Sequence, residues 1–188
     1  MTTRAQALAD RFMDAAGSVM LAVGLCPEEV WRAPRYDGRS LADLTYRFTR
    51  RLRDHGAAIA ALIASGDGPS SPSPAPDSAH DARESLAAPA DRTQQDLLDL
   101  LRQTADEIAR AIAGLTDQQL ARRVADLSDP TQRITFEDAI KSRLIVPTRR
   151  HFRRYVALWE RRPAMFPSAT PSSSASVHAA LRYIESTR

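Results

Sequence analysis

One ten-residue stretch, V-P-T-R-R-H-F-R-R-Y from Val146 to Tyr155, concentrates side chains that could do chemistry. It holds four arginines, one histidine, two aromatic residues and a proline. An imidazole can ligate a metal or carry a proton near neutral pH, and guanidinium groups bind carboxylates and phosphates. Three interpretations are open at this point: a basic clamp for nucleic acid, the remnant of a metal site, and a helix with one buried and one solvated side.

At about 100° per residue, the stretch is predicted to form a helix with its histidine turned inward. The inner face comprises Ile140, Leu144, Pro147, His151, Tyr155 and Leu158. Arg149 and Arg153 fall almost opposite this face and are expected in solvent. Arg150 and Arg154 fall on the flank beside the core. Because the arginines are spread around the helix, they do not form a single basic stripe.

A second apolar group widens the inner face sideways and consists of Ile145, Phe152, Val156 and Trp159. A helix with so wide an apolar arc needs neighbours on two sides. The extra neighbour is expected to be a C-terminal helix around Leu181, another subunit, or a mixture of both.

Pro147 lies inside this predicted helix. It lacks the N–H that would bond to the Arg143 carbonyl, so the helix is predicted to kink or widen there. An arginine from the facing helix is a plausible donor to that carbonyl.

Four amphipathic helices are expected, each opening at a residue that can cap it. The starts lie at Thr3, Ser40, Thr93 and Thr135. The residues three positions later are, respectively, Gln6, Asp43, Asp96 and Asp138. The apolar residues recur at helical spacing as Leu8, Phe12, Ala16, Val19 and Val23, then Leu41, Leu44, Phe48, Leu52, Ile59 and Leu62, then Leu97, Leu101, Thr104, Ile108, Ala111 and Leu115. No strand-like alternation of useful length and no internal repeat is evident.

The fold class expected is all-α, a four-helix bundle of residues 1–162. The Ser/Pro-rich segment 65–91 is an insertion predicted to be a flexible loop, because it cannot bury enough apolar surface to offset its ordering entropy. Residues 163–188 are expected to be a Pro/Ser linker and a short C-terminal helix, whose apolar pattern is Val177, Leu181 and Ile184.

The composition narrows the function classes. A chain of 188 residues fits one domain, and no apolar run is long enough to cross a membrane, so a cytoplasmic protein is expected. Cys26 is the only cysteine, which excludes an intrachain disulfide. The sequence pI is about 9.5, but the formal net charge is only +3 and Lys141 is the only lysine. The use of arginine in place of lysine is typical of proteins encoded by GC-rich genomes, so the high pI does not indicate a surface selected for polyanions. Specific nucleic-acid binding is therefore not expected.

Four short segments together resemble the DinB-like (DinB/YfiT) four-helix bundle family. They are P-E-E-V-W-R-A-P at 27–34, G-R-S-L-A-D-L at 38–44, G-L-T-D-Q-Q-L at 114–120 and I-T-F-E-D-A-I at 134–140. The likeness covers about Arg4 to Glu160 and implies an up-down-down-up bundle that is often dimeric. It also implies a divalent metal held by three histidines, one from the second helix and two from the fourth. Some members are thiol-dependent S-transferases or isomerases.

The metal pattern of this family fails in the present sequence. The histidine position of the second helix is Arg47, the first position of the fourth-helix pair is Pro147, and only His151 remains. Neither a guanidinium nor a pyrrolidine ring can ligate a cation, and catalytic zinc needs about three protein ligands. No zinc or nickel cofactor is therefore expected. His55 and His151 are expected to be partly buried and hydrogen-bonded within the bundle. The alternative is a shifted metal site that uses both of them.

The remaining candidates form a ligand pocket on the second and fourth helices. They are Arg47, Arg51, His55, Arg143, His151 and Arg154. Buried guanidiniums need carboxylates or a bound anion. Asp14, Asp43 and Asp54 are the internal partners expected, and a small carboxylate- or phosphate-bearing ligand is the alternative.

The function expected is a metal-free module for a small ligand or a partner protein. A link to stress physiology follows from the family resemblance alone, and a homodimer is one alternative assembly. The alternative function is a thiol-dependent S-transferase or isomerase, in which His151 could serve as a general base.

Overall fold

The computed structural model describes residues 2–33, 39–64, 92–126 and 131–160, with side chains up to Leu158. These residues are mostly helical, and the all-α class predicted from the sequence is confirmed for them. The long helices are α1 (Arg4–Gly24), α3 (Leu41–Ala64) and α4 (Gln94–Ala113). A further long helical rod runs through α6 (Phe136–Ile140), the π-helical turn η1 (Lys141–Ile145) and α7 (Val146–Glu160).

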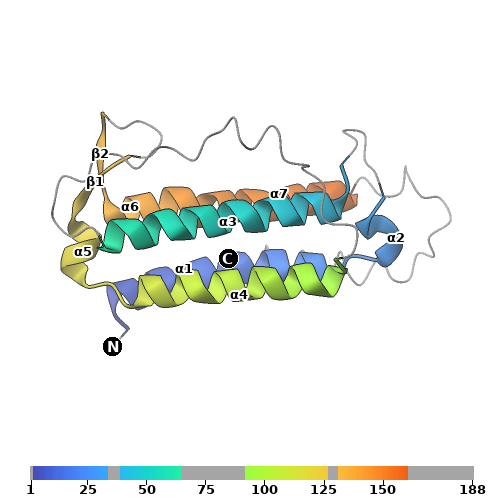
Figure 1. Ribbon diagram of the computed structural model, residues 1–188, viewed down its shortest axis with the longest axis horizontal. Coiled ribbons are helices and arrows are strands. Elements are labelled where there is room, and N and C mark those ends of the chain that lie inside the picture. Colours follow the sequence, from blue (N-terminus) through green and yellow to red (C-terminus); the bar gives the residue numbers. More distant parts are fainter. Residues whose placement is uncertain (1, 34–38, 65–91, 127–130, 161–188) are drawn as a thin grey trace.

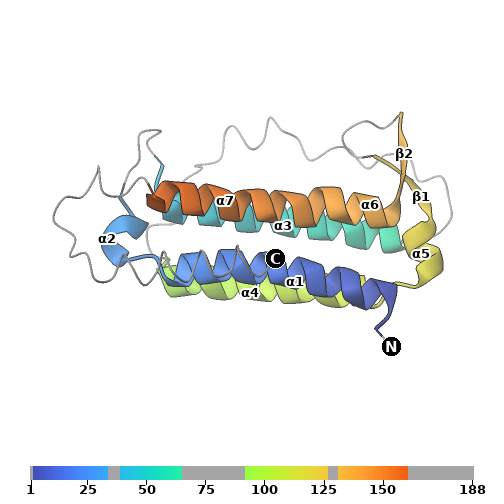
Figure 2. The ribbon, with the colours of Figure 1, turned by 180° about the vertical axis from the view of Figure 1, so that it is seen from behind.

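These helices lie side by side in two layers (Figures 1 and 2). One layer holds α1 and α4, and the other holds α3 and the α6–η1–α7 rod; we call them the α1–α4 layer and the α3–α7 layer. In Figure 1, α1 and α7 run in one direction along the long axis, and α3 and α4 run in the other. The backbones of α1 and α4 approach each other along their length, and α1 also packs against α7.

The helix starts agree with the capping residues predicted from the sequence. The Thr3 hydroxyl accepts a hydrogen bond from the backbone N–H of Gln6. Thr93 and Asp96 form a capping box, in which each side chain accepts from the other residue's backbone N–H. The same reciprocal arrangement opens α3 at Ser40 with Asp43. Capping groups of this kind satisfy N–H donors that the helix itself leaves without partners.

The connection between α4 and α6 contains structure that the sequence did not predict. A short helix, α5 (Asp117–Ala121), is followed by strands β1 (Arg123–Ala125) and β2 (Arg133–Thr135). The strands pair antiparallel, with Arg123 opposite Thr135. Three residues are too few to display the alternation by which a strand is recognised, so the expectation of no strand was wrong on this point. A four-residue helix, α2 (Glu28–Trp31), also lies in the connection that follows α1.

The core lies between the two layers and contains the predicted apolar stripes. Phe12 and Val19 of α1 and Leu97 and Leu101 of α4 are completely buried. Of the apolar group that was predicted to widen the inner face of the fourth helix, Ile145, Phe152 and Val156 are buried. Because α7 packs against α1 as well as facing α3, a second neighbour lies within the described chain itself.

Several predictions concern residues outside the described ranges. They are the loop at 65–91, the C-terminal helical pattern of Val177, Leu181 and Ile184, and the side chain of Trp159. Among the helices that are described, none is both long enough and apolar enough to traverse a lipid bilayer.

Candidate functional site

The rod formed by α6, η1 and α7 widens just before Pro147, as the sequence predicted. In η1 each backbone N–H bonds to the carbonyl five residues earlier, and not four as in an α-helix. The Val146 N–H, for example, donates to the Lys141 carbonyl. One residue beyond the proline, the Thr148 hydroxyl donates to the Leu144 carbonyl at 2.6 Å. The missing N–H of Pro147 is therefore accommodated by a π-turn, a feature that often occurs at functional sites.

Aromatic rings fill the space between α3 and α7. The ring of His151 stacks on Phe48 of α3, with centroids 4.1 Å apart and planes inclined by 10°. The rings of His151 and Tyr155 meet in an edge-type contact, with centroids 5.0 Å apart and planes inclined by 64°. The backbones of α3 and α7 approach closely at far fewer points than those of α1 and α4. The contact between α3 and α7 is therefore made mainly by side chains.

Buried hydroxyl groups extend this contact toward the start of α3. The hydroxyls of Tyr155 and Thr45 are hydrogen-bonded to each other. The Thr45 hydroxyl donates to the Leu41 carbonyl at 2.8 Å, and the Tyr155 hydroxyl lies 3.4 Å from the same oxygen. All three residues are buried. The sequence placed Tyr155 on the inner face but gave no sign of its partner, because Thr45 lies 110 positions earlier in the chain.

His151 is neutral over the physiological pH range. Burial is the main cause that lowers its pKa to about 3, and the positive charges of Arg154 and Arg51 lower it further. Its Nε2 atom is buried without a hydrogen-bond partner among the described residues. The expectation that this histidine is hydrogen-bonded within the bundle is therefore wrong for Nε2. A base whose conjugate acid has so low a pKa accepts protons weakly, which argues against general-base catalysis by His151.

His55 lies in a related environment farther along α3. Its pKa is lowered, first by partial burial and then by the charge of Arg143, while Asp54 acts in the opposite direction and Arg51 lowers it slightly more. Arg143 is itself held by Asp126, the residue directly after β1, with 3.3 Å between the guanidinium and carboxylate atoms. The sequence did not identify Asp126, since its position depends on the short hairpin that was not predicted.

The structure brings most of the predicted pocket residues together between α3 and α7. We call this region the α3–α7 seam, and it comprises Thr45, Phe48, Arg51, His55, Arg143, His151, Arg154 and Tyr155. Arg51 and Arg154 are exposed, whereas Arg47 and Arg143 are partly buried. The guanidiniums of Arg51 and Arg154 therefore lie at the solvent rim, close enough for their charges to act on the buried imidazole.

The seam is poorly suited to a metal cation. Within the described ranges, no three side chains of histidine, cysteine, aspartate or glutamate lie together in a way that could hold one. Arg51 and Arg154 add positive charge beside His151, and this charge opposes a cation as it opposes protonation. The same positive charge favours an anion.

Comparison with known proteins adds no template for the seam. The chain matches no protein-family model, no curated protein and no solved structure. The seam itself combines a neutral buried imidazole, aromatic walls and a basic rim.

Proposed function

We propose that this protein is a DinB-like four-helix bundle that binds a small anionic ligand at the α3–α7 seam without a metal. The long helices in two layers, with α1 and α7 running opposite to α3 and α4, support an up-down-down-up arrangement (Figure 1). The ligand class is a small molecule that bears a carboxylate or a phosphate. A setting in stress physiology would follow from the family resemblance, and the chemistry of the seam has no bearing on it.

The observation that carries the proposal is the buried Nε2 atom of His151. A polar atom that is buried without a hydrogen-bond partner costs about 1–3 kcal/mol, and this cost is recovered when a ligand atom pairs with it. In the tautomer with its proton on Nε2, a neutral imidazole donates one hydrogen bond. It would then present that donor to an oxygen atom of the ligand.

The rim supplies the charge that an anion requires. Arg51 approaches the imidazole from α3 and Arg154 approaches it from α7, so the two guanidiniums belong to different helices. Guanidinium groups match carboxylate and phosphate oxygens with paired N–H donors. An anion bound between them would make charge-assisted contacts to both helices and would strengthen the layer in which backbone contact is sparse.

The test is a thermal-unfolding series with inorganic phosphate, sulfate and succinate, compared with sodium chloride at equal ionic strength. Wild type, Arg51→Ala and His151→Phe form the test set. Arg53→Ala is the matched control, since Arg53 is another exposed arginine on α3 whose charge does not act on His151. We expect one anion class to raise the melting temperature of wild type and Arg53→Ala. The rise should be lost in Arg51→Ala and reduced in His151→Phe.

Two results would overturn the proposal. The first is an equal rise in all four proteins, which would show a general ionic effect, and the second is no rise with any of the three anions. The dimer expected from the family is tested separately by light scattering at high protein concentration. A monomeric mass there would remove the dimer and leave the ligand proposal intact.

A further inference from the structure

The solvent side of α7 carries mainly positive charge. The helix contains four arginines and one acidic residue, Glu160, at its C-terminal end. Arg149, Arg150, Arg153 and Arg154 are all exposed. At about 100° per residue these four cover an arc of roughly 140°. The middle of this arc faces away from His151, whereas Arg154 at its edge lies beside the seam, and we call the four arginines the α7 basic arc.

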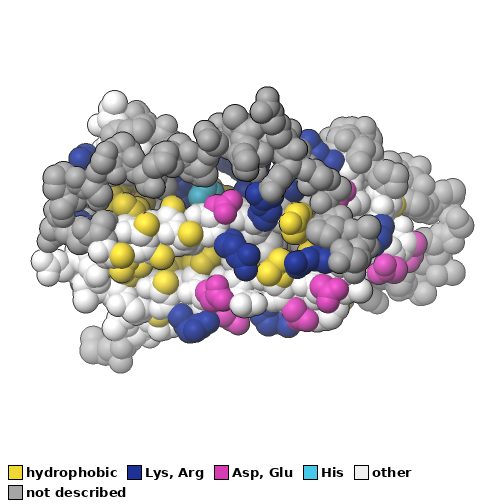
Figure 3. All heavy atoms as spheres, viewed as in Figure 1, with side chains coloured by type: hydrophobic (Ala, Val, Ile, Leu, Met, Phe, Trp, Pro, Cys, Tyr) yellow, Lys and Arg dark blue, Asp and Glu magenta, His cyan; other side chains and the backbone are white. Residues whose placement is uncertain are grey.

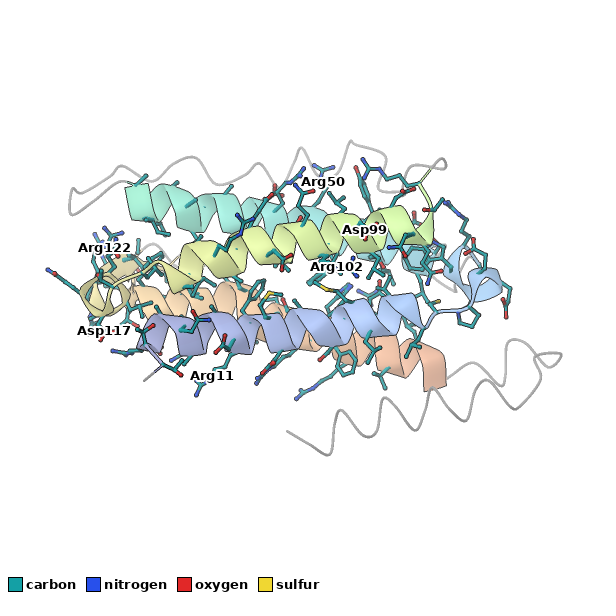
Figure 4. All side chains as sticks on the ribbon, turned by 90° about the horizontal axis from the view of Figure 1, so that it is seen from below. Arg11, Arg50, Asp99, Arg102, Asp117 and Arg122 are labelled. Carbon is teal, nitrogen blue, oxygen red and sulfur yellow. The ribbon has the colours of Figure 1, made fainter. Side chains whose placement is uncertain are left out.

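The α3 helix also has an excess of basic residues, with four arginines and two aspartates, but of these arginines only Arg51 and Arg53 are exposed. The α1 helix has two basic and two acidic residues, and α4 has two basic and four acidic residues. On α4 the two signs pair directly, as in the ion pair of 2.7 Å between Asp99 and Arg102 (Figure 4). On the face formed by α3 and α4, basic and acidic side chains lie side by side (Figure 3). The small net charge of the whole chain therefore conceals a strongly basic surface on one helix.

We infer that the α7 basic arc docks the phosphodiester backbone of nucleic acid without reading its base sequence. Nucleic acid is a partner that charge alone can hold, since neutralised phosphates release counterions and supply most of the non-specific affinity. Phosphate contacts position a protein on nucleic acid, and they carry no sequence information.

The apolar content of the arc argues against other polyanionic partners. A stable protein–protein interface has an apolar core enriched in aromatic residues, and a helix that inserts into a membrane surface needs an apolar face. The arc offers one exposed large apolar side chain, Val146. The aromatic rings of Phe152 and Tyr155 are buried, so neither provides a platform for base stacking. A surface of charge without apolar anchors fits a phosphate backbone.

The spacing of the arginines suits this partner. Arg149 and Arg150 lie one helical turn from Arg153 and Arg154, a separation of about 6 Å along the axis. The α7 basic arc therefore presents guanidinium groups on two successive turns, and each turn can contact a different phosphate of one strand.

The experiment measures fluorescence anisotropy of two labelled DNA duplexes of unrelated sequence, titrated with the full chain at 50 and 200 mM salt. The test variant combines Arg149→Gln, Arg150→Gln and Arg153→Gln. The matched control combines Arg11→Gln, Arg53→Gln and Arg133→Gln, which are exposed arginines on α1, α3 and β2. Both variants lose the same net charge, and circular dichroism verifies that each is folded. Arg51 and His151 stay unchanged, so the result is independent of the small-anion proposal.

We expect wild type to bind both duplexes with equal affinity and to lose about forty-fold in affinity from 50 to 200 mM salt, as three neutralised phosphates imply. The α7 variant should lose at least ten-fold at 50 mM salt, and the control variant no more than about two-fold. Equal losses in the two variants, or no binding by wild type at 50 mM salt, would overturn the inference. Equally tight binding of a poly-glutamate peptide or of vesicles rich in anionic lipid, lost in the same α7 variant, would overturn the assignment to nucleic acid.

Discussion

The two layers of the molecule are built from helices of similar length but are held together differently. Between α1 and α4 the backbones lie close, and the contact consists of completely buried apolar residues such as Phe12 and Leu101. Between α3 and α7 the backbones approach less often, and stacked rings and buried hydroxyls fill the space. Nearly all of the unbalanced positive charge also lies in the α3–α7 layer.

Under the proposed function, the part of the molecule that stabilises the fold and the part that binds a ligand lie in different layers. Close apolar packing contributes stability in proportion to the area buried. Buried polar groups contribute little net stability, and they lower it when they lack a hydrogen-bond partner. The α3–α7 layer therefore keeps a polar interior at some cost in stability, which is the usual condition of a binding site.

The largest effect is expected from truncating the α1–α4 layer. Phe12→Ala removes a completely buried ring from α1 and should lower the free energy of unfolding by about 3–5 kcal/mol. Phe48→Ala in the seam should lower the free energy of unfolding by clearly less, because the layer around Phe48 is less closely packed. Urea denaturation of both variants measures the difference, and equal losses would remove the distinction between the layers.

Acid should destabilise the protein through His151. Its pKa is about 3 in the folded protein and near 6.5 in the unfolded chain, so only the unfolded chain gains the proton as the pH falls between these values. This group should lower stability by roughly 1.4 kcal/mol per pH unit within that window, and the loss ends near pH 3.

The control for this prediction is His151→Phe, which keeps a ring on Phe48 but cannot titrate. At pH 7 its stability should lie within about 1 kcal/mol of wild type, because an apolar ring replaces a polar one in a buried place. Urea denaturation at pH 7 and pH 4.5 isolates the histidine, since carboxylates such as Glu137, whose pKa is lowered chiefly by its hydrogen bond with Lys141, are common to both proteins. A wild-type loss no greater than that of the variant would contradict the lowered pKa.

A smaller loss is expected where α3 meets α4. A Cβ atom added at Gly56 would lie 2.7 Å from the Cγ1 atom of Ile108. Gly56→Ala should therefore force α3 and α4 apart locally and cost about 1–3 kcal/mol despite the better helix propensity of alanine. Thermal unfolding measures this loss of stability. A variant as stable as wild type would show that the contact between residue 56 and Ile108 can relax.

The smallest effect, and the only gain, is expected at Gly17 on the exposed side of α1. A Cβ atom there meets nothing within 4 Å. Gly17→Ala should therefore stabilise the protein by about 0.5–1 kcal/mol, because alanine loses less conformational freedom in a helix. The same thermal measurement serves as the counterpart of Gly56→Ala. A loss of stability at Gly17 would mean that another chain or segment packs against this side of α1.

Local chemistry in the sequence determined where the helices begin and which sides they bury. Thr3, Ser40, Thr93 and Thr135 cap helices because their hydroxyls accept from a backbone N–H only three positions away, so the pattern is complete within a few residues. The inward turn of His151 and the widening before Pro147 follow from helix periodicity and from the missing proline N–H, and both were predictable.

Tertiary structure decided most of the electrical state of the site and the partners of its residues. The pKa of His151 is lowered first by burial and then by the charges of Arg154 and Arg51. Arg154 is a neighbour in the same helix, but Arg51, like Phe48 on which the imidazole stacks, lies about a hundred positions earlier in the chain. The pairing of Arg143 with Asp126 depends on a hairpin too short to recognise in the sequence. Local rules act over one helical turn, whereas desolvation and charge act between whichever segments the packing brings together.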